Sequence, residues 1–336
     1  MRKPRLMLPV HRWPEIDRAV WEVAMRTGDI FEDAGPAAHW SEGSKRTVCF
    51  GYRRWLGHLA LTDPEALELS PRERVSPDIV AAYIELLQSS ISPTGVYDYA
   101  KHLYDAIRVI APEGNWRWLH AVARQLQRLV VPPNKRPRMV DAHRLSALGL
   151  ELIDCAETSQ DKRPSQKAVL YRDGLIIALL SARPMRRRNL AAMRIGTHLI
   201  RNGQGYAITF GASETKNRQP ITSTVPDDLL PYLERYLDVY RPMIPGAKEH
   251  LGLWASMKGG PMTGEALYER ICRHTKAAFG KPVNPHLFRD CVATTIAIED
   301  PVNVQIAADL LGHSSLEFTS KYYIQAETVE AGCAFR

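Results

Sequence analysis

The segment from Val131 to Arg138 constrains the fold of this 336-residue chain more than any other stretch. Its three prolines lack the amide hydrogen that a helix needs, so no regular helix can cross it. Its three basic side chains, Lys135, Arg136 and Arg138, give it a strong positive charge. We therefore predict two domains joined by a basic, proline-rich linker at residues 131–140. The linker is either a plain solvated connection or a strap that crosses the backbone of a nucleic acid.

Residues 1–130 are predicted to form a helical domain, because their apolar residues recur at helical spacing. The pairs Ser76-Pro77 and Ser92-Pro93 match a helix start with a serine N-cap and proline at the first helical position. The aromatic residues lie within the apolar pattern, so we interpret them as core rather than as base-stacking residues. The expected helices span residues 14–31, 44–61, 79–88, 96–110 and 116–129.

Residues 141–336 are predicted to form a mixed domain that is mainly helical. Alternating apolar residues around the turn Asn202-Gly-Gln-Gly205 indicate short antiparallel strands. The fold class predicted for the whole chain is therefore mainly α with a small antiparallel β-sheet. In this second domain the expected strands are 197–200, 206–210 and 221–225, and the expected helices are 145–156, 168–181, 228–240, 264–279, 288–298, 302–311 and 316–328.

The positive charge of the chain is concentrated in its second part. The formal net charge is +7; residues 1–130 hold 17 Lys/Arg against 16 Asp/Glu, and residues 131–336 hold 27 against 21. A basic surface of this kind is typical of a domain that meets a polyanion, although a soluble protein of basic pI is the simpler alternative.

Several classes of protein are excluded by composition. With 45% hydrophobic and 24% charged residues, the chain is typical of a globular protein. Its five cysteines form no C-x-x-C pair and show no metal-ligand spacing with histidine, so we expect no metal and a reduced, cytoplasmic environment. The longest apolar run, residues 175–180, is too short to cross a bilayer, and we expect no membrane role.

Groups that can handle a phosphodiester are clustered in the last quarter of the chain. His286 and Arg289 form an H-x-x-R motif, His313 follows in L-L-G-H, and Tyr322 lies nine residues beyond His313. Cleavage of a phosphodiester without a metal needs groups that hold the developing charge, an in-line nucleophile and a proton donor for the leaving oxygen. Histidine, arginine and a tyrosine hydroxyl can supply the first two, so the pattern indicates cleavage of nucleic acid.

Arginine and histidine are expected to hold the phosphate. A guanidinium never loses its charge and binds two oxygens at once, so Arg186, in the frame R-x-x-N-L, and Arg289 are the candidate clamp. On a helix start, His286 and Arg289 share one face, and His286 is the candidate acceptor of the tyrosine proton. His313 is predicted to lie between a glycine C-cap and a capping box, at a rigid corner between two expected helices.

The proton donor and the nucleophile each have one candidate. Lys216 lies between the second and third predicted strands, where a flexible amine can enter a groove and protonate the leaving 5′ oxygen. Tyr322 and Tyr323 are adjacent. Neighbouring helical residues point about 100° apart, so only one of the two can face the phosphate. Its spacing from His313 makes Tyr322 the candidate nucleophile, and we assign Tyr323 to packing.

The order Arg186, Lys216, His286, Arg289, His313, Tyr322 resembles the tyrosine site-specific recombinases, also called the phage integrase family. The resemblance implies a transient 3′-phosphotyrosyl link, a free 5′ hydroxyl, and neither a metal nor another cofactor. It also implies a two-domain, C-shaped clamp on double-stranded DNA with specific recombination sites, assembled as a tetramer on paired sites. Residues 1–130 look like the family's core-binding domain, and residues 141–336 like its catalytic domain. A recombinase of this kind would be associated with the nucleoid.

One position departs from the family pattern, and two other functions remain open. Asn189 stands where the family usually has an acidic residue, which puts the electrostatic support of a neighbouring histidine in doubt. A type IB-like topoisomerase would use a similar catalytic set without exchanging DNA partners. A DNA-binding regulator could use the same fold with its catalysis lost.

Overall fold

The structure is a computed structural model that describes residues 7–132, 134–203 and 205–299. The chain divides into two compact units, Met1–Pro133 (unit 1) and Asn134–Arg336 (unit 2). The predicted helices at 302–311 and 316–328 lie outside the described residues, as do the candidate site residues His313 and Tyr322.

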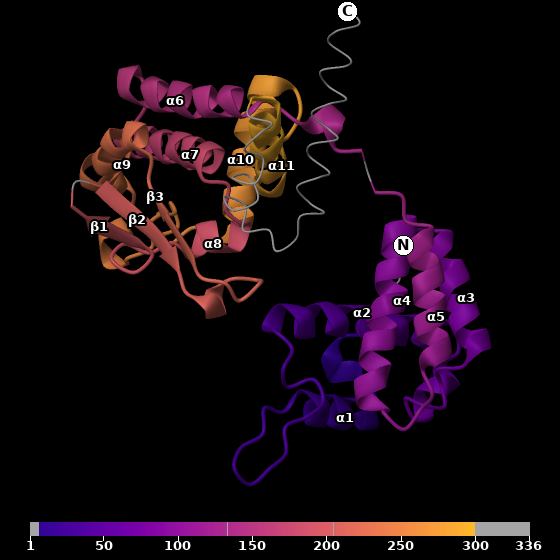
Figure 1. Cartoon of the computed structure of the whole chain (residues 1–336). Helices are drawn as coiled ribbons and strands as arrows, with labels where there is room; N and C mark the ends of the chain where they lie inside the picture. Colours follow the sequence, from indigo (N-terminus) through magenta and orange to yellow (C-terminus); the bar gives the residue numbers. More distant parts are fainter. Residues whose placement is uncertain (1–6, 133, 204, 300–336) are drawn as a thin grey trace, which may run out of the picture. The chain divides into compact units, whose positions relative to one another are not determined.

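Unit 1 is helical in its described part, as the sequence predicted. Ser76 Oγ accepts a hydrogen bond from the backbone N–H of Ile79 at 3.4 Å, and Ser92 Oγ accepts one from Gly95 at 3.3 Å. Both serine-proline pairs therefore begin helices in the predicted way. The helices of unit 1 are α1 (Glu15–Met25), α2 (Glu42–Thr62), α3 (Pro77–Gln88), α4 (Pro93–Ile110) and α5 (Arg117–Arg128) (Figure 1).

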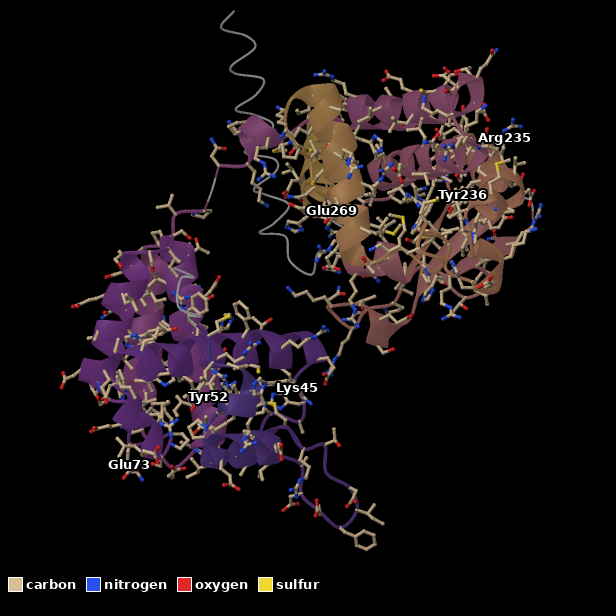
Figure 2. All side chains as sticks on the ribbon, turned by 180° about the vertical axis from the view of Figure 1, so that it is seen from behind. Lys45, Tyr52, Glu73, Arg235, Tyr236 and Glu269 are labelled. Atoms are coloured by element: carbon tan, nitrogen blue, oxygen red, sulfur yellow. The ribbon has the colours of Figure 1, made fainter. Side chains whose placement is uncertain are left out.

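Most aromatic residues of unit 1 pack in its core, which confirms their interpretation as packing residues, whereas Phe31 and Phe50 are exposed. Tyr52, Trp55 and Tyr83 are fully buried, and Figure 2 shows Tyr52 within the unit. The Tyr52 hydroxyl donates to Asp17 Oδ1 at 2.5 Å, and Asp17 also pairs with the buried Arg74 at 2.9 Å. The attraction between the two buried groups offsets part of the cost of burying them, although burial still raises the pKa of Asp17.

The first predicted helix was too long. We expected residues 14–31 to be helical, but α1 ends at Met25, and the backbone of Arg26 is extended. Gly28 adopts a left-handed conformation with φ 72°, and the chain then folds back so that Gly35 N–H donates to the Arg26 carbonyl at 2.9 Å. The apolar residues of the sequence continue beyond Met25, so their spacing did not reveal the turn that ends the helix. Contacts with residues further along the chain define that turn.

Unit 2 is built on two long helices that pack very closely. Gly149 on α6 (Ala142–Thr158) faces Gly174 on α7 (Pro164–Ala182), and a Cβ on Gly174 would lie 2.5 Å from the Gly149 carbonyl oxygen. A larger side chain at either glycine would therefore force the two helices apart. In the part of unit 2 that the structure describes, the remaining α-helices are α8 (Arg187–Ala192), α9 (Leu230–Arg235), α10 (Gly264–Phe279) and α11 (Pro285–Glu299).

The sheet of unit 2 is antiparallel, with the strand order β1-β2-β3. Leu199 pairs with Ile208, and Ile208 pairs with Ser223. A mainly helical chain with a small antiparallel sheet is therefore the fold class, as predicted. The strands are β1 (Leu199–Asn202), β2 (Gly205–Phe210) and β3 (Ile221–Thr224).

Several boundaries in unit 2 differ from the prediction, and two of them have a clear structural cause. Strand β1 begins at Leu199 rather than at residue 197, because the preceding residues form a turn in which Leu199 N–H donates to the Arg194 carbonyl at 3.0 Å. The single helix expected at 228–240 is divided into a 3₁₀ turn, α9 and a π-turn, Tyr236–Tyr240. The Tyr236 hydroxyl, inside unit 2 (Figure 2), donates to the Leu253 carbonyl at 3.0 Å.

Within the described part of the chain, no helix has both the length and the apolar character needed to cross a bilayer.

Candidate active site

Arg186 lies in the short turn between α7 and α8. Helix α7 ends at Ala182, and Pro184 follows, whose missing amide hydrogen prevents the helix from continuing. Arg186 is the N-cap residue of α8, with extended backbone angles φ −67° and ψ 143°, and it is partly buried. The break between the two helices therefore places Arg186 at a fixed point of the unit.

Helix α11 brings His286 and Arg289 to the same turn. The side-chain oxygen of Asn284 accepts from Leu287 N–H at 2.9 Å and so caps the start of the helix. His286 is exposed in the first helical turn, whereas Arg289, one turn further on, is only 6% exposed. Arg289 Nη1 donates to the Pro184 carbonyl at 2.7 Å, which ties α11 to the segment that carries Arg186.

Charged groups of both signs act on His286. The pKa of His286 is lowered, and the largest cause is partial burial, although the residue keeps an exposed surface. The second largest effect is that of the Asp290 carboxylate, which raises the pKa. The positive charges of Lys135, Arg289 and Arg186 lower it further. A lowered pKa keeps the imidazole neutral near pH 7, and the neutral form is the one that can accept a proton.

Asn189, the departure from the family pattern, is buried on α8 at 3% exposure. Its amide nitrogen, Nδ2, makes no hydrogen bond within the described part of the protein. A buried amide without a partner costs about 1–3 kcal/mol, so this position does not contribute to stability through that group. The side chain keeps the shape of an acidic residue without its charge.

Lys216 is exposed in the loop between β2 and β3. The loop is ordered on both sides of the lysine: Glu214 pairs with His198 at 2.7 Å, and Thr215 Oγ1 donates to the Gln219 carbonyl at 2.7 Å. The pKa of Glu214 is lowered mainly by its hydrogen bond from His198, and the charge of Arg188 on α8 also contributes. The charge of Arg188, which lies on the helix that Arg186 caps, therefore acts on this loop.

The structure thus brings together three of the six candidate residues, and it places a fourth in a neighbouring loop. Arg289 bonds to the turn that carries Arg186, the charges of both arginines act on His286, and Lys216 is carried by the β2–β3 loop. Sequence reasoning gave no role to His198 or Asp290. For Asp290 a signal existed, because it directly follows Arg289 and lies one helical turn after His286; for the isolated His198 the sequence offered none.

The second half of the predicted linker lies against α11. Lys135 Nζ pairs with Asp290 Oδ2 at 2.7 Å, and Lys281 Nζ donates to the carbonyls of Pro137 at 2.8 Å and Met139 at 3.1 Å. Arg138 Nη2 donates to the Pro282 carbonyl at 3.5 Å. We call the segment 134–142, which is held in this way, the strap. Its contacts with DNA remain a prediction.

We expect the strap to contribute to the salt dependence of DNA binding. Replacing Lys135, Arg136 and Arg138 together with alanine should lower the slope of log K against log salt by about one unit for each phosphate that the variant no longer neutralises. The measurement is a titration of duplex DNA at several salt concentrations. Arg235→Ala is the control, because this residue pairs with Glu157 on the side of unit 2 away from α11 (Figure 2). An equal slope in the triple variant and the wild type would leave the strap a plain connection.

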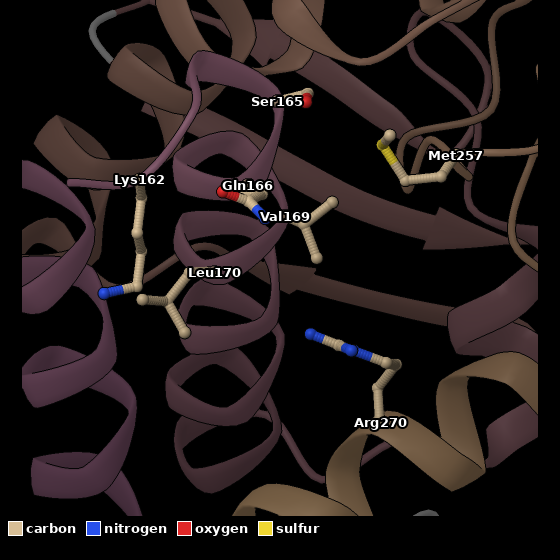
Figure 3. A pocket seen from close by; sticks show the side chains of 7 residues that line it. All are labelled: Lys162, Ser165, Gln166, Val169, Leu170, Met257 and Arg270. Carbon is tan, nitrogen blue, oxygen red and sulfur yellow. The ribbon is translucent and has the colours of Figure 1, made fainter.

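A pocket of about 390 Å³ lies elsewhere in unit 2 and shares no residue with the candidate site (Figure 3). Arg270 points into it and also pairs with the buried Asp173, which accepts further bonds from Arg172 and His274. The charges of this cluster are satisfied within the protein, so we interpret it as a structural brace between α7 and α10. The pocket is lined by Lys162, Ser165, Gln166, Val169, Leu170, Met257 and Arg270.

The arrangement of two arginines around a histidine can be compared with known proteins. Residues 151–329 match the model of the phage integrase family, which covers more than half of the chain. The chain belongs to the phage integrase family. Among curated relatives, the tyrosine recombinase XerD of Chlorobaculum tepidum is 28% identical over 163 residues, which are 48% of this chain and 51% of the relative. XerD of Staphylococcus saprophyticus is 28% identical over 154 residues, or 45% and 50% of the two chains.

The chain spans about half the length of the curated relatives it matches. Two solved structures share the fold of this chain. The site-specific recombinase XerH, bound to a palindromic difH substrate in a post-cleavage complex, aligns with a TM-score of 0.60 at 17% identity, over 86% of this chain and 78% of its own. The pre-cleavage complex of XerH with difH aligns with a TM-score of 0.58 at 18% identity, over 87% and 80%.

Proposed function

We propose that this phage integrase family member is a site-specific DNA recombinase that cuts and rejoins strands through a transient 3′-phosphotyrosyl link at Tyr322. The observation that carries the proposal is that Arg289 bonds to the turn that carries Arg186 and that the charges of both arginines act on His286. The two arginines belong to different helices and lie more than 100 residues apart in the sequence. Their guanidinium groups can hold both nonbridging oxygens of one phosphate beside a neutral proton acceptor.

In the proposed reaction, the Tyr322 oxygen attacks phosphorus and the bond from phosphorus to the 5′ oxygen breaks. His286 accepts the phenolic proton, and Lys216 gives a proton to the leaving 5′ oxygen. Arg186 and Arg289 hold the charge on the nonbridging oxygens, and His313 completes the phosphate-holding set. In the reverse step a 5′ hydroxyl attacks the phosphotyrosine, so the bond energy is kept in the covalent link and no cofactor is consumed.

The proposed partners are double-stranded DNA with specific recombination sites and further copies of the chain. Support for DNA comes from the structural relative XerH, whose solved complexes contain its difH substrate. The excess of basic residues after residue 130 supports the same partner. We propose that a tetramer assembles on two paired sites, with each chain clamping the duplex, and that the protein acts in the cytoplasm at the nucleoid.

A library of nicked duplexes with randomised sequence tests this function. After cleavage next to a nick, the short strand diffuses away and the covalent adduct is trapped; a denaturing gel isolates it, and sequencing identifies the site. Adducts on one sequence class, together with recombinant products from plasmids carrying two such sites, are expected. Relaxation of supercoiled plasmid without recombinants would establish the type IB-like topoisomerase instead. Selective DNA binding without any adduct would establish the regulator.

We expect cleavage to continue in excess EDTA. The two guanidinium groups supply the electrostatic stabilisation that a metal ion would otherwise provide to the phosphate. Adduct formation on the selected site should therefore proceed at the same rate with and without chelator. Activity that disappears in EDTA and returns with magnesium would overturn this mechanism.

A further inference from the structure

Glu214 joins the loop that carries Lys216 to the body of unit 2. Its Oε2 accepts from Gly211 N–H at 2.8 Å, which closes the 3₁₀ turn Ala212–Glu214. Its Oε1 lies 2.7 Å from His198 Nε2. The Glu214 carboxylate thus makes one hydrogen bond within the loop and one to His198 outside it. Glu214 itself lies two positions before Lys216.

His198 is a rigid partner for this carboxylate. It is 5% exposed, and its ring stacks on Phe210 with the centroids 4.8 Å apart. Arg194 N–H donates to His198 Nδ1 at 3.1 Å, so Nδ1 is an acceptor and the proton lies on Nε2. The backbone bond therefore fixes both the tautomer and the orientation of the ring, and Nε2–H donates to Glu214.

The lysine follows directly from this anchor. Thr215, which is buried, closes the next turn with a bond from Oγ1 to the Gln219 carbonyl at 2.7 Å, and Lys216 stands inside that closure. Arg218 in the same turn has a left-handed backbone with φ 54°. Residues other than glycine rarely adopt this backbone conformation, and it persists only where the surrounding structure holds it. An exposed lysine on a surface loop is thus carried by backbone that is fixed on both sides.

We propose that Glu214 and His198 are positioning residues for Lys216: the pair holds the β2–β3 loop so that the ammonium group reaches the leaving 5′ oxygen. The inference rests on the proposed function, because it assigns a role in the same cleavage step. Displacing a catalytic group by about 1 Å can cost up to about 10²-fold in rate, so an anchor two residues away is close enough to matter.

Single-turnover cleavage of the selected site by Glu214→Ala tests this role. The rate is expected to fall about tenfold or more on the ordinary DNA substrate. On DNA with sulfur in place of the bridging 5′ oxygen, the variant should cleave at nearly the wild-type rate, because a thiolate leaves without a proton. Glu234→Ala is the matched control: Glu234 pairs with Arg201 at 3.2 Å, and its side chain is 41% exposed against 43% for Glu214. Glu234 does not touch the loop through this ion pair, so its removal should leave both rates unchanged.

A double variant separates positioning from general stability. In a Lys216→Ala background, adding Glu214→Ala should slow cleavage no further. If Glu214 affects the cleavage rate only by positioning Lys216, its removal has no effect once the lysine is absent. His198→Gln, which keeps an N–H donor for Glu214, should lie between wild type and Glu214→Ala. Additive effects, or an equal decrease on the oxygen and sulfur substrates, would show that the pair only stabilises the fold. If the wild type forms no adduct, the proposed function fails; if it does and Glu214→Ala behaves normally, only the positioning role fails.

Discussion

The variant Tyr322→Phe is expected to form no covalent adduct with DNA, whereas Tyr323→Phe is expected to form it at close to the wild-type rate. Only a hydroxyl on the residue that faces the phosphate can attack it, and phenylalanine removes that oxygen while keeping the ring. In the helix predicted at residues 316–328, adjacent side chains would point about 100° apart, so we expect only one of the two tyrosines to face the phosphate. The spacing of Tyr322 from His313 selects it as the nucleophile.

Trapping on a nicked duplex, followed by a denaturing gel, measures both variants against the wild type. DNA binding by Tyr322→Phe should be retained, since the substitution removes one hydroxyl and no positive charge. An adduct in Tyr322→Phe that is missing in Tyr323→Phe would transfer the role to the neighbour. Adducts in both variants would place the nucleophile elsewhere in the chain.

Lys216→Ala is expected to slow cleavage by roughly a hundredfold or more, the usual effect when acid catalysis is removed. A 5′ alkoxide leaves phosphorus poorly unless it is protonated, and a 5′ thiolate leaves well. Sulfur at the bridging 5′ position should therefore restore most of the rate in Lys216→Ala. It should not restore the rate in Arg186→Ala or Arg289→Ala, because their task is to hold charge on the nonbridging oxygens.

The buried position of Arg289 calls for a second variant at that site. Its bond to the Pro184 carbonyl helps to join α11 to the α7–α8 turn, so alanine removes a packing interaction together with the charge. Arg289→Lys keeps a cation and tests the phosphate role with less disturbance. Single-turnover rates on oxygen and sulfur substrates decide the assignment. If sulfur at the bridging 5′ position raised the rate equally in the Lys216 and arginine variants, Lys216 would position the DNA and would not be the proton donor.

Local signals in the sequence were sufficient for most of the fold. The serine N-caps Ser76 and Ser92 mark helix starts through bonds to residues three positions away, and helix α10 has the predicted bounds of 264–279. The strand positions followed from alternation and from one glycine turn. Errors occurred where a boundary depends on distant contacts, as at the end of α1 and in the division of residues 228–240.

The candidate site was predictable as a set of residue types but not as a network. Arg186, His286 and Arg289 were identified from motifs, and their meeting follows from the contact between α11 and the α7–α8 turn. The pairs Lys135–Asp290 and His198–Glu214 were missed, because each joins segments without a shared motif. The first pair spans 155 residues, and no local pattern encodes a contact across that distance.

The strap bears on where the proposed catalytic domain begins. Val140 N–H donates to the buried Cys291 Sγ at 3.4 Å, and Ala142 N–H donates to Thr295 Oγ1 at 3.0 Å, so the segment continues along α11 from the Lys135 ion pair. A fragment cut at residue 141 would retain every candidate catalytic residue and still lack the lysine charge next to His286. Because Lys135 lowers the pKa of His286 and Asp290 raises it, the imidazole of that fragment would hold its proton more tightly. The pKa of His286 therefore depends in part on Lys135, which lies outside the H-x-x-R motif that identifies the site.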